Sequence, residues 1–325
     1  MSTTPTTHLG VVIVTYNNAP DLPQCLDALQ SHAGEAWVVV RDCGSSDQSV
    51  ELADQHPVVN RVITGTNVGF GAACNEAVDS LGPDIEMVLL LNPDTAIDCD
   101  LADLLEYVAR FGEFGCVGIQ QNSFSGDLVW SWDEFPTVPL EWQKARKTPL
   151  LQRSPVGYTD DRRVDWNMGA FLLIPRSALA LAAGFDEQFF LFYEEIDLQQ
   201  RLARIGRPTY YVNKFHYQHD RSDKATLWRE VLRLNSRRAY DRKWLTRFQT
   251  LQCQVAQSYR WIQDAIRPQR ERDRRLVIPR LFATWGLIRA VVPPEAIEGE
   301  LDSWSSVRPF WAQRLESRTT EASNP

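Results

Sequence analysis

Three carboxylates lie within four positions of one another in the second half of the chain: Glu194, Glu195 and Asp197. An aromatic run, FFLFY, precedes them, and the residues after them predict an amphipathic helix that carries arginines. Carboxylates beside so apolar a run lose part of their hydration, which raises their pKa and makes them usable as general bases. The alternative is that acids at a helix start only interact with the helix dipole. This stretch alone leaves both interpretations open.

Two further acids follow apolar runs in the first half of the chain. Asp94 comes after MVLLLN and is placed to hold a divalent cation that bridges phosphates, although an ordinary Asn-Pro-Asp turn is the alternative. Asp42 comes after AWVVV and could accept the imide N–H of uracil or thymine, or it could cap a turn. If Asp94 holds a metal, His219 could complete its shell, whereas a lone histidine after a strand is usually structural.

A third set of residues is suited to holding a nucleotide. An aromatic side chain can stack on a base, and a glycine loop lets the backbone approach a ribose or phosphate. The glycines do not form the GxGxxG pattern, which disfavours a dinucleotide site. The residues of this set are Thr15, Tyr16 and Asn17, together with Asn67, Gly69 and Asn75.

The elements that position these residues alternate between strand and helix. Short apolar runs predict strands at 9–16, 36–40, 58–64 and 87–92, with helices between them and at 100–110. Such alternation predicts a mainly parallel sheet that binds ligands at the carboxyl ends of its strands. Further on, we expect an irregular region of short strands and a mobile loop at 116–163, a strand at 164–174 in which Gly169 allows close backbone approach, and one or two helices at 226–262.

Composition indicates a globular protein with an uneven charge distribution. The 325 residues carry a net charge of −8, and 44% of them are hydrophobic. The N-terminal residues do not predict a signal peptide, and no apolar run reaches the length of a membrane span. The six cysteines are scattered, which argues against structural zinc and for reduced thiols, so we expect a cytoplasmic protein. Residues 221–292 hold 17 Lys and Arg against 6 Asp and Glu, a balance of +11, which leaves −19 for the remainder.

The order of the motifs resembles family 2 glycosyltransferases of the GT-A fold. The motifs are VVIVTYN, VVVRDCGSSDQS, NVGFGAACN, LLLNPDT, WNMGAFLLIPR and GFDEQFFLFYEEIDLQQR, followed by a late histidine. The similarity covers roughly residues 9–245, including RRAYDRKW at 237–244. Within the family, the chain looks like the bacterial rhamnosyltransferase and galactofuranosyltransferase branch.

The resemblance implies a Rossmann-like α/β catalytic domain at 1–220, with a mixed, mainly parallel sheet, and a basic, mainly helical C-terminal extension at 221–325. It implies inverting transfer of a sugar from a nucleotide diphosphate donor to an acceptor hydroxyl, with Mn²⁺ or Mg²⁺. Asp94 matches the last acid of the family's DxD motif, whose first acid is replaced by Asn92, and His219 would be the second metal ligand. The base position is occupied by Glu195, with Asp197 as the fallback. The donor would contact Thr15, Tyr16, Asn17, Asp42, Asn67, Gly69, Asn75 and Asp94, and the acceptor would contact Trp166, Gly169 and Glu194.

Partners follow from the same resemblance. We expect dTDP-rhamnose as donor, with a UDP-sugar as the alternative, and a glycan or lipid-linked acceptor. The basic segment 221–292 predicts peripheral contact with the inner face of the plasma membrane, with 281–292 as an interfacial helix. A non-catalytic nucleotide-sugar-binding protein and a nucleotidyltransferase are the alternatives. The latter usually has a glycine-rich, basic loop after its first strand, which VTYNNAPD is not. Nucleic acid is disfavoured, because the arginines of 221–292 alternate with helix-period apolar residues.

Overall fold

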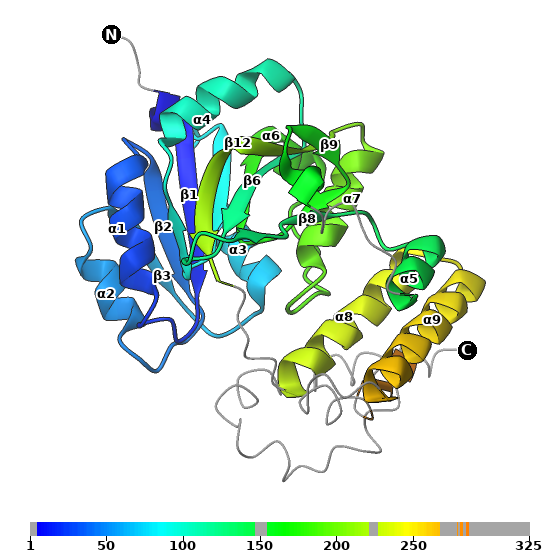
Figure 1. Ribbon diagram of the computed structural model, residues 1–325. Coiled ribbons are helices and arrows are strands. Elements are labelled where there is room, and N and C mark those ends of the chain that lie inside the picture. Colours follow the sequence, from blue (N-terminus) through cyan, green and yellow to red (C-terminus); the bar gives the residue numbers. More distant parts are fainter. Residues whose placement is uncertain are drawn as a thin grey trace, which may run out of the picture.

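A computed structural model describes residues 5–146, 155–220 and 227–266, together with positions 278, 280, 281, 284 and 285. Its centre is a ten-stranded mixed sheet in which eight strands run in the order β3-β2-β1-β4-β11-β6-β12-β5 (Figure 1). The expected fold class, an α/β protein with a mainly parallel sheet between helices and a helical C-terminal part, is confirmed.

The first four strands are parallel, as the alternating pattern predicted. They are β1 (Leu9–Thr15), β2 (Trp37–Asp42), β3 (Val59–Thr64) and β4 (Met87–Leu91). The connecting helices are α1 (Leu22–His32), α2 (Ser49–Gln55) and α3 (Phe70–Asp79), and α4 (Leu101–Val108) follows later. All seven residues of β1 are buried, which explains its unbroken apolar sequence. The core on one face of the sheet includes residues of α1 and α4, and the core on the other includes residues of α3, α6 and α7.

The other half of the sheet is mixed. Its strands are β5 (Thr95–Ile97), β6 (Cys116–Asn122), β11 (Phe171–Pro175) and β12 (Thr209–His219), and the short strands β7 (Leu128–Val129) and β9 (Arg162–Val164) pair with β6 and β12. β11 runs antiparallel to both of its neighbours. A separate two-stranded sheet joins β8 (Trp132–Asp133) to β10 (Trp166–Asn167).

One expectation for this half was wrong. The predicted strand 164–174 is broken, because the backbone of Asn167 does not bond to the main sheet. It donates its N–H to Gln199 Oε1 (2.7 Å) and accepts from Gln199 Nε2 (2.8 Å), which ties it to α7. The short strands expected within 116–163 are present as β6, β7 and β8, and β6 has seven residues and lies between β11 and β12.

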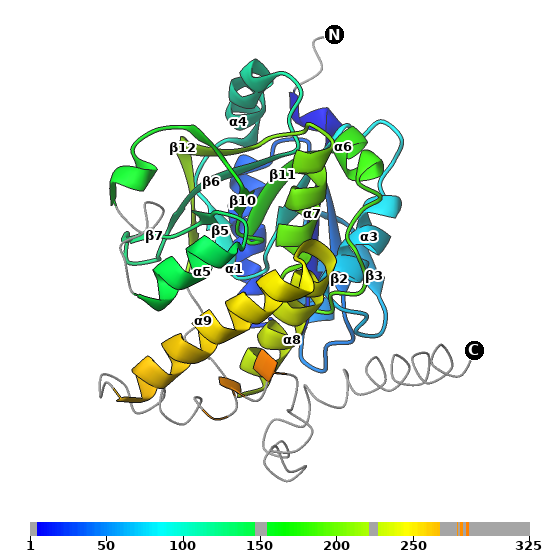
Figure 2. The same cartoon turned by 90° about the vertical axis from the view of Figure 1, so that its right-hand side faces the viewer.

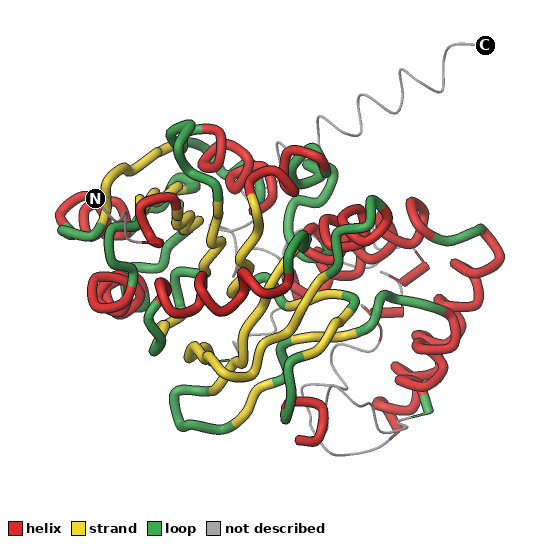
Figure 3. Tube along the Cα trace, turned by 90° about the horizontal axis from the view of Figure 1, so that it is seen from above, coloured by secondary structure: helices red, strands yellow, loops and turns green. Residues whose placement is uncertain are grey.

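The remaining helices are α5 (Val138–Ala145), α6 (Arg176–Leu181), α7 (Glu194–Arg204), α8 (Leu227–Trp244) and α9 (Arg247–Ile266), and short 3-10 helices span Pro5–His8, Ala109–Phe111 and Pro155–Tyr158. The predicted helical region 226–262 is thus two helices, which lie with α5 to one side of the sheet (Figures 1 and 2). Seen from above, helices lie on both sides of the strands (Figure 3). Among the described helices, none has the length and apolarity needed to cross a bilayer.

Candidate active site

The turn that precedes α7 has an unusual backbone. Phe192 and Tyr193 have φ values of +69° and +70°, and Tyr193 is the residue before the first turn of the helix. Two consecutive left-handed residues with large side chains are rare, and such strain persists where the surroundings hold it in place. The turn sets the direction in which Glu194 and Glu195 leave the chain, and strained backbone of this kind is concentrated at functional sites.

Both glutamates at the start of α7 have raised pKa values. Burial raises the pKa of Glu195 to about 7, and burial together with the neighbouring Glu195 charge raises the pKa of Glu194 well above its ordinary range. In each residue the buried Oε2 has no hydrogen-bond partner. Glu194 packs beside Gly71 in α3 and is almost fully enclosed, whereas Glu195 keeps partial access to solvent. Of the two, Glu195 is placed to exchange a proton near neutral pH.

Hydrogen bonds fix Glu195 against the end of the sheet. Gln199, one helical turn later, donates to the Glu195 carbonyl (3.0 Å) as well as binding Asn167. A Cβ built on Gly169 would lie 3.7 Å from Glu195 Cβ, an ordinary van der Waals contact, so Gly169 faces this side chain although the contact does not require a glycine. The next residue, Ala170, accepts a hydrogen bond from the backbone N–H of Asn92 (3.0 Å). The base candidate therefore lies beside the end of β4, where the chain continues to Asp94.

Asp197 is not suited to be a reserve base. Its side chain is 0% exposed and is surrounded by donors. Trp244 Nε1 donates to Oδ1 (2.8 Å), Arg201 Nε donates to Oδ2 (2.8 Å), and Lys243 Nζ lies 2.8 Å from Oδ1. With two cations and an indole N–H around it, the Asp197 carboxylate has no path to an acceptor hydroxyl. The structure thus corrects the fallback role of Asp197 and makes it the anchor of α8 on α7.

Asp94 and His219 are brought together by strand pairing. β5 runs antiparallel to β12, with Thr95 opposite His219, so Asp94 lies beside the histidine although 125 positions separate the two. His219 Nε2 is 3.3 Å from Asp94 Oδ1, but the atoms are not aligned for a hydrogen bond, and Oδ1 is buried without a partner. Burial raises the pKa of Asp94, but the interactions with His219 outweigh it, so the pKa lies below its ordinary value.

These two residues fit a divalent cation, with a condition on the histidine. A carboxylate oxygen without a hydrogen-bond partner and an imidazole nitrogen converge, which supplies two ligands of a shell that diphosphate oxygens and water could complete. Gln121 sets the condition: its Oε1 accepts from the Tyr217 hydroxyl, and its Nε2 donates to the His219 carbonyl and Nδ1. A neutral His219 then carries its proton on Nε2, and binding metal there requires the other tautomer. Among the described residues, no three His, Cys, Asp or Glu side chains form a complete metal site.

The loops after β1 and β2 brace one another. Asp42 is almost fully buried, and its Oδ2 accepts from the N–H groups of Gly44 (2.9 Å) and Ser45 (3.0 Å), while its Oδ1 accepts from the Ser45 hydroxyl. Asn17, at φ +54°, accepts from the Ser46 N–H (2.8 Å). Thr15 is buried and Tyr16 is half-buried at the same strand end. Asp42 therefore shapes the turn, and the nucleobase of a donor could reach its carboxylate only by displacing Ser45.

The glycine loop, residues 67–71, does not lie open. It contacts the turn before α7, residues 190–193, which we call the catalytic turn. Gly69, at φ +94°, approaches the Phe190 carbonyl so closely that a Cβ would lie 2.6 Å from its oxygen. Asn67 Oδ1 accepts from the Gly69 N–H (3.2 Å). The Asn75 amide binds the backbone of Phe185 at 2.8 and 3.0 Å. The backbone of the glycine loop was expected to approach a nucleotide, but it approaches the segment before α7. Asn75 binds the same segment.

Trp166 belongs to the core. It is 5% exposed, its Nε1 donates to the Glu134 carbonyl (2.9 Å), and its ring meets Trp130 edge-on. The expectation that it stacks on an acceptor sugar was wrong, because neither ring face nor the N–H is available.

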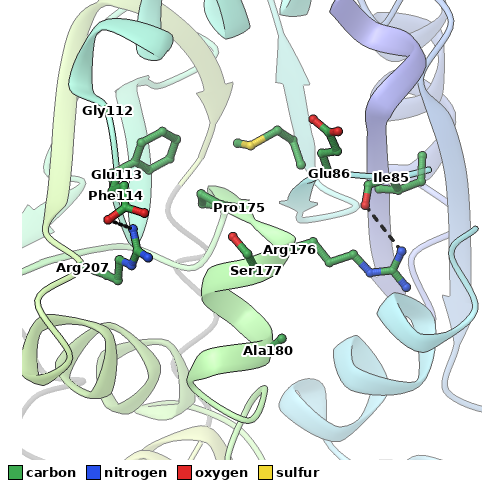
Figure 4. Close-up of a pocket in the computed structure, with 11 residues that line it drawn as sticks. Ile85, Glu86, Gly112, Glu113, Phe114, Pro175, Arg176, Ser177, Ala180 and Arg207 are labelled. Atoms are coloured by element: carbon green, nitrogen blue, oxygen red, sulfur yellow. Dashed lines mark hydrogen bonds and ion pairs between the residues drawn. The ribbon is translucent and has the colours of Figure 1, made fainter. Parts of the chain in front are cut away.

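A cavity of about 690 Å³ lies elsewhere (Figure 4). Met87, the first residue of β4, and Pro175, the last residue of the antiparallel β11, both line it, so it opens at the opposite end of the sheet from Asp94. Three of its charged groups have partners: Arg207 pairs with Glu113 at 2.7 Å, and Arg176 binds the carbonyls of the turn after α3. We do not assign the chemistry to this cavity.

Sequence reasoning did not identify a buried ionic cluster behind the catalytic turn. Arg237 in α8 pairs with Glu141 in α5 (2.9 Å) and with Asp241 (2.7 Å), and all three are nearly inaccessible to solvent. The Arg237 guanidinium lies 5.9 Å from the centre of the Tyr193 ring. The only signal in the sequence was the RRAYDRKW segment, which contains two of these residues.

Comparisons with known proteins agree with this geometry. Residues 10–171 match the model of the family described as glycosyl transferase family 2. The chain is 31% identical over 235 residues to N-acetylglucosaminyl-diphospho-decaprenol L-rhamnosyltransferase of Mycobacterium tuberculosis, covering 66% of this chain and 76% of that protein. It is 29% identical over 228 residues to rhamnosyltransferase WbbL of Escherichia coli, covering 64% and 82%.

The fold has a counterpart among solved structures. The mannosyltransferase PcManGT of Pyrobaculum calidifontis, in complex with GDP-Man and Mn²⁺, superposes with a TM-score of 0.50 at 14% identity, over 94% of this chain and 82% of that one. At this identity the likeness concerns the GT-A fold alone. With the family match and the two relatives, it leads to one conclusion: the chain belongs to glycosyltransferase family 2 and to its rhamnosyltransferase-like branch.

Proposed function

We propose that this glycosyltransferase moves a sugar, rhamnose or a related deoxy or furanose sugar, from a nucleotide diphosphate to a hydroxyl of a lipid-linked or glycan acceptor, with inversion. The observation that carries the proposal is Glu195, a partly accessible carboxyl with a pKa of about 7 at the end of the sheet. The M. tuberculosis relative, named for a diphospho-decaprenol acceptor and for rhamnose, supports the substrate class. dTDP-rhamnose is our first donor and a UDP-sugar the second.

In the proposed mechanism, Glu195 accepts the proton of the acceptor hydroxyl as its oxygen attacks the anomeric carbon from the face opposite the leaving group. Asp94, with His219 in its Nδ1-protonated tautomer, would hold Mn²⁺ or Mg²⁺ against the donor diphosphate. A cation there would stabilise the negative charge that builds up on the departing nucleotide. Burial raises the pKa of the neighbouring Glu194 well above its ordinary range, which disfavours a second negative charge beside the base.

The donor side would be formed by the braced loops. Tyr16 and Asn17 lie at the open edge of the loop after β1 and are the candidates for direct contact with the nucleotide. Thr15, Asp42, Asn67, Gly69 and Asn75 would act through the shape of the loops, because each is buried or already bound to backbone. On the acceptor side we retain Gly169 and Glu194 as the wall beside Glu195. We also propose that residues 1–220 form the catalytic domain and that residues 221–325 form an extension, which is joined to α7 by Trp244 and Lys243. We propose a cytoplasmic location for the protein.

A donor panel tests this function. dTDP-rhamnose, UDP-galactofuranose, UDP-glucose and GDP-mannose would each be combined with Mn²⁺, Mg²⁺ or a chelator, and thermal shift and nucleotide release would be measured. We expect one deoxyhexose or furanose donor to raise the melting temperature only with metal and to release nucleotide when acceptor is present. NMR of the product should show an inverted anomeric centre, and a retained configuration would contradict the mechanism. If Glu195→Gln abolishes donor binding as well as transfer, its role as base is wrong.

A further inference from the structure

The outward face of α9 is a line of exposed apolar side chains. Spacings of three and four residues place them along one side of the helix. We call this line the α9 stripe: Phe248 (68% exposed), Leu251 (45%), Val255 (42%), Tyr259 (45%) and Ile262 (47%).

The opposite side of α9 packs on the rest of the protein. Cys253, Ala256 and Trp261 are buried there, and α5 packs alongside the helix. Trp285 widens the exposed surface, because it is 41% exposed and its Nε1 donates to Ser258 (2.9 Å), next to Tyr259. Within the part of the chain that the structure describes, the stripe is left exposed, and Figure 2 shows α9 along the outside of the molecule.

The two helices that include the stripe carry a net positive charge. Residues 227–266 contain eight Lys and Arg against three Asp and Glu, a balance of +5. Two of these acids are turned inward: Glu230 pairs with Arg233 at 2.7 Å, and Asp241 is buried against Arg237. The exposed arginines include Arg247 at the start of α9. A surface with an apolar line and exposed cations fits an anionic phospholipid bilayer, whose headgroups attract the cations while the apolar side chains enter the interface.

We infer that the α9 stripe docks the protein on an anionic phospholipid surface. A second copy of the chain fits less well, because it would bring two cationic faces together. The sequence had suggested 281–292 as the interfacial helix. Most of that segment lies outside the described residues, and the stripe lies in α9 instead.

One end of α9 is tied to the helix that bears Glu195. Trp244 of α8, three residues before α9 begins, donates to Asp197 in α7, the helix whose first turn contains Glu195. Docking on a bilayer would hold the enzyme at the surface that carries its acceptor, and this step rests on the proposed function, in which the acceptor is lipid-linked.

Vesicle co-sedimentation of the full chain tests the inference. Vesicles of phosphatidylcholine alone would be compared with vesicles that also contain phosphatidylglycerol, at low and high salt. We expect binding only with the anionic lipid, and a loss of at least about tenfold in the partition coefficient for Leu251→Ser/Val255→Ser/Ile262→Ser. The matched control is Leu181→Ser/Ile205→Ser, which removes two apolar side chains that are 60% and 47% exposed outside α9 and should leave binding unchanged.

Each other outcome overturns the inference. Absence of wild-type binding, equal binding by both variants, or binding to neutral lipid alone would each do so. Light scattering after size exclusion tests the alternative that the stripe binds a second copy of the chain. That alternative would be supported if the wild type were a dimer that does not bind lipid and the stripe variant were a monomer. If the triple variant does not fold, Phe248→Ser, at the most exposed position, replaces it. Donor turnover on a water-soluble acceptor is measured in parallel, so a failure of the proposed activity is seen separately from a failure of docking.

Discussion

The proton affinity of Glu195 gives a quantitative prediction for the pH dependence of transfer. Burial raises its pKa to about 7, so the carboxylate is the minor form at acidic pH. For a group with that pKa, roughly 10% of the molecules are ionised at pH 6 and roughly 90% at pH 8, whereas an ordinary glutamate with a pKa of about 4.3 is fully ionised at both. Because only the ionised form can accept the proton, kcat/KM should rise about tenfold between these pH values.

The assay is nucleotide release with acceptor present, followed between about pH 5.5 and 8.5 at saturating metal. Glu195→Gln should lower kcat by roughly 10²- to 10⁴-fold and remove the step near pH 7 from the residual rate. Thermal shift with the product nucleotide over the same range is the control, because a pH effect on donor binding would appear there in both proteins. A wild-type profile that is flat above pH 5.5, or a Gln variant that keeps the step, would refute the assignment of Glu195 as base.

Three other substitutions test the surroundings of the site. Asp94→Asn should weaken Mn²⁺ binding in the presence of nucleotide diphosphate by at least about tenfold, measured by electron paramagnetic resonance, and unchanged affinity would exclude Asp94 as a ligand. Because burial raises the pKa of Glu194, the folded state keeps a proton that the unfolded chain releases above its ordinary pKa of 4.5, and stability falls as the pH rises. Glu194→Gln should therefore gain melting temperature relative to wild type between about pH 5 and 8, and a constant difference would contradict the raised pKa. Trp244→Phe removes a donor from the buried Asp197 and should lower the free energy of unfolding in urea by about 1–3 kcal/mol, whereas Trp37→Phe, at a 45% exposed position, should have no effect.

The strand-end positions could be predicted because they depend on local patterns. An unbroken apolar run such as LGVVIVT predicts a buried parallel strand, and the side chain after it must lie at the carboxyl edge of the sheet. This reasoning located Asp42 and Asp94 correctly at strand ends. The sequence could only suggest that Asp94 and His219 lie close together. Their proximity depends on the register between β5 and β12, which no local pattern specifies.

The roles of several residues could not be read from their type or place in the sequence. Asp197 has the same chemistry as a catalytic base, and only the approach of Trp244 and Lys243 from α8 shows it to be enclosed. Gly69 was expected to admit a ligand, but its backbone admits Phe190 instead. Both contacts join segments more than 45 positions apart, and sequence periodicity carries information only about near neighbours along the chain.

The catalytic turn is held from two sides, and this explains how its strained backbone persists. On one side, Phe190 accepts a hydrogen bond from the N–H of Phe70 (2.9 Å), directly after the glycine loop. On the other, Ser236 of α8 donates to the Leu191 carbonyl (2.8 Å). Left-handed geometry at Phe192 and Tyr193 costs free energy, on the order of 1–3 kcal/mol per residue, that these contacts must offset. If the contact with Phe70 or with Ser236 were lost, the turn could relax and the Glu195 side chain would change direction. The orientation of Glu195 therefore depends on both the glycine loop and α8.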